Sequence, residues 1–494
     1  MKSLAILSTV ILPKNLLLII SLLLILALVV VKAGSRIGAP FLLLFLVLGM
    51  VAGPDVLGFE FESFELAEHF GHFALTIILF EAGLETSLKA TKPVMKQGIL
   101  LSTVGVLLMT LLVGTFSWLV AGKKLGLSVV GCFLLAAIVS STDSEAVFSI
   151  FREKRLKLRE NLAPMLELES GSNDPVAYAF TVVTVSMMTS DVRLAHSGFP
   201  AIMTGVLLFL LQIAVGVAVG VAVGFAAKWL VGKIRFSSSP LTAILLLSLG
   251  FLASGMASLL HGNGLMAIYI TAVVIGNKVK VQNRKEVDHF FEGVSWLMQL
   301  VMFLLLGFLA RPSQMLPLLL PSLLIVVFMI IIARPASVML TLLPFKNLSL
   351  RAKWFVSWVG LKGAGPILCA LIPVVAGISG SHVIFNLVFL ITLFSLLAQG
   401  GTLIKAAKLL HVSYDDDKQV ESFGMDIPEE MGMLRDHIIT EDDLKCGATL
   451  RELHLPHGIR VMMVRRDERF LVPHGSMNLK PGDHLLIIVG ESDD

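Results

Sequence analysis

Long apolar segments recur along most of the chain, and glycine, proline or charged residues interrupt them. Thirteen such segments occur, at about 13–31, 38–53, 70–88, 97–121, 126–150, 160–188, 199–228, 240–260, 263–277, 286–310, 314–343, 353–376 and 382–406. A run of about 20 apolar residues can cross the hydrocarbon core of a bilayer as a helix. These segments lack the alternation of barrel strands, so helices are the predicted spanning structure. The pattern predicts an all-α polytopic membrane protein with about 13 transmembrane helices.

Composition supports this fold class. Of the 494 residues, 56% are hydrophobic and only 15% are charged, whereas ordinary soluble domains carry about 25% charge. A soluble enzyme is therefore excluded. The stretch from Leu16 to Val31 has no clear small-residue cleavage site, so we interpret it as the first span and not as a removed leader.

Lys and Arg concentrate in every second loop. With the N-terminus placed outside, the inner loops hold 22 of them and the outer side holds 6. The outer loop between the second and third spans is acidic, with Asp55, Glu60, Glu62, Glu65 and Glu68. Because cytoplasmic loops carry the excess of basic residues, the N-terminus is predicted outside and the C-terminal tail in the cytoplasm.

The composition changes near residue 410. From residue 408 onward the chain holds 18 of its 36 acidic residues but only 10 of its 39 basic ones. This change predicts a membrane domain over residues 1–410 and a cytoplasmic module over 411–494, with Asp415, Asp416 and Asp417 in the linker. Short β-like runs at 458–464, 470–473 and 485–489, with a Pro481-Gly482-Asp483 turn, predict a small α+β domain.

The fifth span ends in a polar run, Ser140–Glu145. Short hydroxyl side chains compete for backbone hydrogen bonds and favour breaks in a helix. Asp143 either caps a helix near the cytoplasmic surface or faces an ion from an unwound segment. Charges at bilayer depth are costly, which makes such residues functional candidates.

The sixth span carries the densest group of polar residues. Glu169 and Asn173 are one helical turn apart, as are Ser170 and Asp174, so their side chains occupy adjoining helix faces. Carboxylate, hydroxyl and amide oxygens are the ligands that hard cations prefer. Asp174 can carry a proton or lie beside a cation, and the alternative is a structural acid held by hydrogen bonds.

The second half of the chain contributes two buried bases. Arg334 lies within an apolar run, and Lys362 lies in Gly360–Pro366, whose three glycines and proline predict a second broken helix. Arg334 keeps its proton and needs an acidic partner in the membrane, and Glu169 is the predicted one. Glu81 and His261 are weaker candidates.

The two predicted breaks occupy matching positions. Spans five and twelve are each the fifth member of a six-span set, if span 7 joins spans 1–6 to spans 8–13. A single linking span inverts the second set. Two inverted six-helix repeats with two crossing broken helices are typical of secondary transporters, which bind substrate at that crossing.

These residues together resemble the sodium/proton-exchanger branch of the monovalent cation:proton antiporters, and most closely the bacterial potassium/proton antiporters of the cell-volume-regulation type. The matching motifs are Ser141-Thr142-Asp143, Glu169-Ser170-Gly171-Ser172-Asn173-Asp174-Pro175, Ala333-Arg334-Pro335 and Gly360-Leu361-Lys362-Gly363-Ala364. The resemblance covers nearly all of residues 1–410. It implies thirteen helices, a homodimer in the lipid of the bacterial inner membrane, and alternating access by an elevator-like movement.

The resemblance also implies roles for individual residues. Asp174 would bind the monovalent cation and the proton alternately. Further oxygens would come from Thr142, Asp143, Ser170 and Asn173. Glu169 and Arg334 would form a structural ion pair, and Lys362 would be the charge of the second broken helix. Ser144 stands where the family usually has proline, and Lys362 where it usually has arginine; both departures keep the charge and bear on fine selectivity.

The tail resembles the C-terminal regulator-of-potassium-conductance (TrkA-C, RCK-C) domain in its strand, Pro-Gly-Asp turn and strand. The resemblance implies a regulatory domain for a small nucleotide, such as a cyclic dinucleotide or an adenine nucleotide. No tail residue identifies that ligand, and a solubilising tail without a ligand is the alternative.

Secondary antiport of K⁺ for H⁺, electroneutral because Asn173 cannot ionise, is the predicted function. An Na⁺/H⁺ antiporter of the same fold is the first alternative, since both cations use the same oxygens. An RCK-gated cation channel is the second, but Thr103-Val104-Gly105-Val106 has no second glycine and no preceding pore helix. Neither enzymatic activity, nor a cofactor, nor a nucleic-acid partner is expected.

Overall fold

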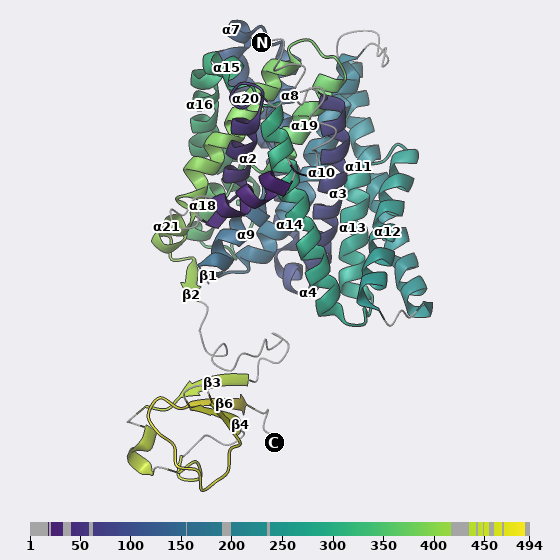
Figure 1. Ribbon diagram of the computed structural model, residues 1–494. Helices are drawn as coiled ribbons and strands as arrows, with labels where there is room; N and C mark the ends of the chain where they lie inside the picture. The colour runs from purple at the N-terminus through teal and green to yellow at the C-terminus, as the bar shows by residue number, and fades with distance from the viewer. Residues whose placement is uncertain are drawn as a thin grey trace. The chain divides into compact units, whose positions relative to one another are not determined.

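The chain forms two compact units, Met1–Tyr414 and Asp415–Asp494. The computed structural model describes residues 18, 21–32, 41–58, 63–154, 156–189, 199–234, 238–415, 434–440, 443–447, 449–453, 459–466 and 469–489. These ranges leave out the linker residues Asp416 and Asp417. They also leave out the part of the predicted first span that precedes Ser21, except Leu18. Figure 1 shows the first unit as a bundle of helices lying side by side.

The helices of the first half follow the predicted spans in order. They are Ser21–Lys32, α2 (Phe41–Ala52), α3 (Phe64–Glu85), a long helix Leu88–Gly122 containing α4 (Leu88–Thr91), α5 (Met95–Leu100) and α6 (Val106–Ser117), then α7 (Lys123–Leu125), α8 (Val129–Ile138), α9 (Ser144–Glu153) and α10 (Leu162–Met188).

The second half repeats the arrangement after one linking helix, α11 (Phe199–Lys233). It contains α12 (Ser239–Leu259), α13 (Gly264–Lys278), α14 (Arg284–Leu309), a long helix Pro312–Leu342 containing α15 (Pro312–Met315), α16 (Leu319–Phe328) and α17 (Arg334–Leu342), then α18 (Leu350–Trp358), α19 (Ala364–Val375), α20 (Ser381–Ser395) and α21 (Leu403–Leu409).

Six of the described helices are long and apolar enough to cross a membrane, and five further apolar helices are shorter. The helices α3 and α10 are long enough, at 22 and 27 residues, but carry several carboxylates. With α8 and α9 counted as one broken span, and α18 and α19 as another, the helices account for the thirteen predicted spans. The prediction of a helical polytopic fold is confirmed.

Both predicted breaks are present and touch each other. The first separates α8 from α9 at residues 139–143, and the second separates α18 from α19 at residues 359–363. The backbone N–H of Asp143 donates to the carbonyl of Leu361 over 2.8 Å. The two broken helices therefore cross within the bundle, where their unpaired backbone groups find partners in each other.

The helix α14 is held close to α2 by glycines. A Cβ at Gly307 would lie 2.7 Å from the Cα of Gly49, which leaves no room for a side chain at the crossing. Small residues at such contacts let two membrane helices approach closely and gain van der Waals packing. This contact fixes the helix that forms one wall of the site described below.

The third span begins earlier than predicted. The helix α3 starts at Phe64, and the Ser63 hydroxyl accepts from the N–H of Leu66 over 3.2 Å. Glu65 and Glu68 therefore lie on the first turns of the helix and not in the loop, a correction explained by this cap and by the preference for acids at helix N-termini. Glu60 and Glu62 lie outside the described residues.

The second unit is a small β structure. Four antiparallel strands, β3 (Leu434–Ile438), β6 (His484–Val489), β4 (Ile459–Arg466) and β5 (Arg469–Leu471), lie in that order in one sheet. Its core includes Val464, Leu485 and Ile439. The sequence predicted three of these strands and missed β3, whose polar residues Arg435, Asp436 and His437 hide its strand pattern. Where the first unit ends, β2 (Ser413–Asp415) pairs with β1 (Leu156–Leu158).

Candidate cation site

The first break places Asp143 at the start of α9. Its carboxylate oxygen Oδ1 accepts from the N–H groups of Glu145 and Ala146 over 3.0 and 3.2 Å. The two alternatives for Asp143 are thus combined in one side chain, which caps the helix and also lines a cavity. Its carboxylate is held in one orientation by the backbone of α9.

Asp174 reaches the same break from α10. The hydroxyl of Ser141 donates to Oδ1 of Asp174. One turn earlier on α10, the hydroxyl of Ser170 donates to the carbonyl of Thr142 over 3.0 Å and accepts from the N–H of Ser144 over 3.1 Å. These bonds fasten α10 to the unwound segment between α8 and α9.

Asn173 and Thr142 bind each other. The Asn173 amide donates to the Thr142 hydroxyl over 2.6 Å, and its oxygen accepts from the Thr142 N–H over 3.4 Å. Both side chains are buried, whereas Asp143 and Asp174 are partly exposed. The amide and the hydroxyl therefore orient the break, and the two carboxylates face the open space.

Lys362 connects the two breaks. Its side chain is 1% exposed, and its Nζ donates to the carbonyls of Ser141 and Ser140 over 2.7 and 3.3 Å. Backbone carbonyls that an intact α8 would bond internally accept hydrogen bonds from the Lys362 side chain instead. These two bonds stabilise the unwound segment that carries Ser141 and Asp143.

A buried ion pair lies behind the crossing. Arg334, at the start of α17, places Nη2 2.7 Å from Oε1 of Glu169 on α10. The two residues are 4% and 1% exposed. The structure thus brings together the two residues that the sequence paired, away from the cavity that Asp143 and Asp174 line.

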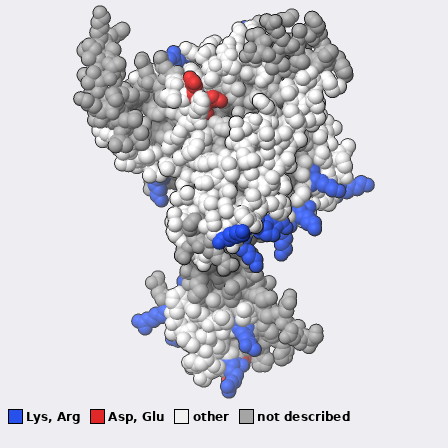
Figure 2. All heavy atoms as spheres, turned by 90° about the vertical axis from the view of Figure 1, so that its right-hand side faces the viewer, with Lys and Arg blue, Asp and Glu red and all other residues white. Residues whose placement is uncertain are grey.

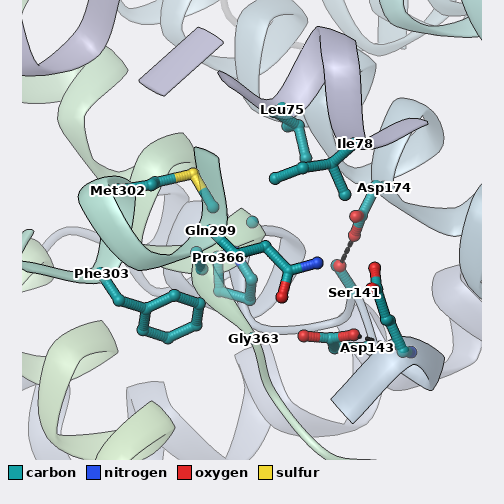
Figure 3. Close-up of a pocket in the computed structure, with 13 residues that line it drawn as sticks. Leu75, Ile78, Ser141, Asp143, Asp174, Gln299, Met302, Phe303, Gly363 and Pro366 are labelled. Carbon is teal, nitrogen blue, oxygen red and sulfur yellow. Dashed lines mark hydrogen bonds between the residues drawn. The ribbon is translucent and has the colours of Figure 1, made fainter. Parts of the chain in front are cut away.

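The two aspartates face a small cavity of about 40 Å³ (Figure 3). It is lined by five parts of the fold: by Leu75 and Ile78 of α3, by Ser141 and Asp143 of the first break with Glu145 of α9, by Asp174 of α10, by Gln299, Met302 and Phe303 of α14, and by Gly363 of the second break with Ala364, Gly365 and Pro366 of α19. Such a volume holds a water molecule or a small cation, since one water needs roughly 10–15 Å³ on this measure.

A second cavity, of about 90 Å³, adjoins the first. Both are lined by Asp143, Glu145 and Asp174. The second also holds the acids Glu81, Glu85 and Glu167, together with Arg152. The second cavity therefore adds further carboxyl oxygens beside the two aspartates.

The donor set suits a hard monovalent cation. The groups nearest the cavity are carboxylate, hydroxyl, amide and backbone oxygens. Among the described residues, no group of three or more His, Cys, Asp and Glu side chains is arranged to hold a resident metal ion.

Comparison with known proteins agrees with this geometry. The family model "Sodium/hydrogen exchanger, transmembrane" matches residues 20–408 of the chain. The chain belongs to the sodium/hydrogen exchanger family. A TrkA-C domain model matches residues 434–493 of this exchanger, in its second unit.

Curated relatives of the exchanger align over nearly its whole length. The K(+)/H(+) antiporter NhaP2 of Shewanella oneidensis is 34% identical over 458 residues, which are 92% of this chain and 77% of that protein. The K(+)/H(+) antiporter NhaP of Alkalimonas amylolytica is 33% identical over 483 residues, or 97% and 81% of the two chains. The solved structure of the sodium proton antiporter MjNhaP1 from Methanocaldococcus jannaschii shares the fold, with a TM-score of 0.66 and 23% identity over 79% of this chain and 97% of that one.

The exchanger has cavity residues that the sequence prediction did not select. Ser141 bonds directly to Asp174, although the sequence points to it only as part of the Ser141-Thr142-Asp143 motif. Glu145 and Gln299 line the cavity and were not named as site residues. Gln299 carried a usable signal, because it is an amide inside the apolar run of a span, but nothing local shows which helix faces the site. Glu81 lines the adjoining cavity, and His261 lies exposed in the turn after α12.

Proposed function

We propose that this exchanger moves K⁺ against H⁺ by alternating access, with one cation exchanged for one proton at Asp174. The observation that carries the proposal is the pair of carboxylates, Asp143 and Asp174, on one water-sized cavity at the crossing of two broken helices. Asp174 would hold the proton or lie beside the cation. Asp143 would supply a second carboxylate, while Thr142, Asn173 and Ser170 hold the break in shape or add oxygens.

The charges at the crossing support one-for-one exchange. With Glu145 protonated and Lys362 charged, Asp143 and Asp174 bring two negative charges and Lys362 brings one positive charge. Glu169 and Arg334 cancel each other. When neither aspartate carries a proton, one negative charge is left over, and either one proton or one monovalent cation neutralises it. The loaded site is then neutral in both half-cycles, and a buried neutral site avoids the cost of an unpaired charge.

K⁺ is proposed as the cation because the relatives that span most of the chain are K(+)/H(+) antiporters by name. Na⁺/H⁺ exchange is the second candidate. It is supported by the "Probable Na(+)/H(+) antiporter 2" of Methanocaldococcus jannaschii, 27% identical over 335 residues, which are 63% of this chain and 73% of that protein. The oxygen donors of the cavity suit both cations.

We propose a homodimer in the bacterial inner membrane, with the N-terminus outside. Figure 2 shows Lys and Arg gathered at one end of the membrane unit, the end where α11 finishes at Lys233 and α14 begins at Arg284. Basic residues favour the cytoplasmic side, which supports this orientation. Residues 411–494 would form a cytoplasmic regulatory domain, and the TrkA-C match favours a small nucleotide as its ligand.

Exchange can be tested with the purified protein in liposomes that enclose a pH-sensitive dye. An outward K⁺ gradient should drive H⁺ inward, and an inward K⁺ gradient should drive H⁺ outward, whereas choline gradients of the same size should do nothing. Repeating the measurement with Na⁺ ranks the two candidates. Cation flux that continues without any opposing proton movement would contradict the proposal and indicate a channel.

A further inference from the structure

Gln299 enters the cation cavity from a helix that carries neither break. It lies on α14, three residues before Met302, in a stretch of the helix that is otherwise apolar. Figure 3 shows its amide extending toward Ser141 and the two aspartates. The side chain lines the same 40 Å³ cavity as Asp143 and Asp174 and is 4% exposed.

The amide lies beside Glu145 of α9, which lines the same cavity. Among the described residues, the amide oxygen Oε1 is buried without a hydrogen-bond partner. A buried carbonyl oxygen without a partner is costly, and such a group in a native structure calls for an explanation. An amide oxygen at the wall of a cavity that also holds two carboxylates has an obvious partner in a cation.

We propose that Oε1 of Gln299 is a ligand of the transported cation, and that it helps set the preference between K⁺ and Na⁺. The assignment rests on the proposed exchange at Asp174. It adds a neutral oxygen from α14 to the charged oxygens of the broken helices. The oxygen is the atom assigned to the ion because, among the described residues, it is buried at the cavity wall without a hydrogen-bond partner.

A neutral carbonyl oxygen matters more for the larger ion. Selectivity between K⁺ and Na⁺ depends on the number and field strength of the carbonyl dipoles around the ion as well as on cavity size. K⁺ holds its ligands at longer distances and accommodates more of them. Removing one oxygen from the wall of the cavity should therefore weaken K⁺ binding more than Na⁺ binding, and leave protonation of Asp174 possible.

The test replaces Gln299 by methionine, which keeps the length of the side chain and removes the amide. In proteoliposomes, the K⁺ concentration that half-saturates exchange should rise about tenfold, equivalent to one lost interaction with a charged group. The rise for Na⁺ should be smaller, and the maximal rate should change little.

Ser295→Ala is the matched control. Ser295 lies one helical turn before Gln299 on α14, is fully buried and also has an unpartnered oxygen among the described residues, but it does not line the cavity. The Ser295→Ala variant should half-saturate at the same K⁺ and Na⁺ concentrations as the wild type. If Gln299→Met yields too little folded protein, Gln299→Asn shortens the reach by one methylene, keeps the amide, and should give the same shift in smaller measure.

The outcomes separate this inference from the proposed function. If the wild type exchanges cations for protons but Gln299→Met half-saturates at unchanged K⁺ and Na⁺ concentrations, Gln299 is not a ligand. If K⁺ and Na⁺ affinities fall by the same factor and Glu145→Gln reproduces this effect, Gln299 only positions Glu145, which also overturns the inference. If the wild type itself shows no coupled exchange, the proposed function fails first.

Discussion

Breaking the ion pair between Glu169 and Arg334 should unfold the exchanger more readily, with a loss of stability that the contacts allow us to estimate. Arg334 Nη2 lies 2.7 Å from Oε1 of Glu169, and its other contact is a long hydrogen bond of 3.5 Å to the carbonyl of Val359. Beyond the ion pair, neither carboxylate oxygen of Glu169 has a hydrogen-bond partner among the described residues, nor does Arg334 Nε. Each buried charge is therefore stabilised mainly by the other member of the pair.

Glu169→Ala leaves the guanidinium of Arg334 buried without a counter-charge. Removing one partner of a buried pair costs about 3–5 kcal/mol. That loss is comparable to the whole free energy of unfolding of a marginal domain, about 5–15 kcal/mol, so the amount of folded protein should fall sharply. By contrast, replacing both residues by apolar ones should recover most of the loss, since no charge is then left buried.

The assay is the melting temperature and yield of folded protein in detergent for Glu169→Ala, Arg334→Met and the double variant Glu169→Leu with Arg334→Met. Glu167→Ala is the matched control, because Glu167 lies on the same helix but faces the acidic cavity and not Arg334. A double variant that loses the sum of the two single losses would refute the pair, because independent sites add and paired sites do not.

Three further predictions concern the tail and the charge balance. Deleting the chain after Asp415 keeps the pairing of β2 with β1. The truncated protein should still exchange ions, but with a different dependence on internal pH or on added nucleotides. If the truncated and full-length proteins respond in the same way to pH and to nucleotides, the tail has a structural role only. Burial alone would raise the pKa of Asp483, but hydrogen bonds from Arg466 and from the Lys480 N–H, with their positive charges, hold that pKa below its usual range. The carboxylate therefore stabilises the tail at neutral pH, and the stability is lost as pH falls through the lowered pKa, below about pH 4; amide-exchange protection of β4 and β6 should drop there, and Asp483→Asn should abolish the drop. A membrane potential changes the energy of a transported net charge by about 2.3 kcal/mol per 100 mV. Because the proposed cycle moves no net charge, a potential applied with both ion gradients clamped should not shift the equilibrium of exchange. A shift proportional to voltage would show that a second charge is carried.

Much of the helical architecture was predictable, because lipid imposes long apolar runs whose ends are marked by charge. The two breaks were predictable for a different physical reason. Hydroxyl side chains in Ser140–Glu145 and glycines in Gly360–Pro366 weaken a helix locally. The start of α3 was missed, because its acidic first turn resembles a loop in sequence and only the structure shows that Ser63 caps the helix. The strand β3 was missed because its polar residues show no apolar alternation.

The site was predictable only in part. The sequence predicts that Asp174 and Ser170 lie side by side, because residues four apart on one helix are neighbours on its surface. Contacts between distant segments depend on packing, which local patterns do not encode. The packing of α14 and of the second break around the first break decides two features of the site. Lys362 donates to the carbonyls of Ser140 and Ser141, and Gln299 faces the cavity.

The most direct test of the central claim is the ratio of protons to cations exchanged in proteoliposomes by the wild type and by Asp174→Asn. Glu286→Gln is the control, because it makes the same kind of change on α14 outside both cavities, where Glu286 accepts a hydrogen bond from Ser239. The wild type and the control should exchange one proton for each cation, while Asp174→Asn should fold and exchange neither. Exchange by Asp174→Asn at more than about a tenth of the wild-type rate would contradict the claim that Asp174 trades the proton for the cation.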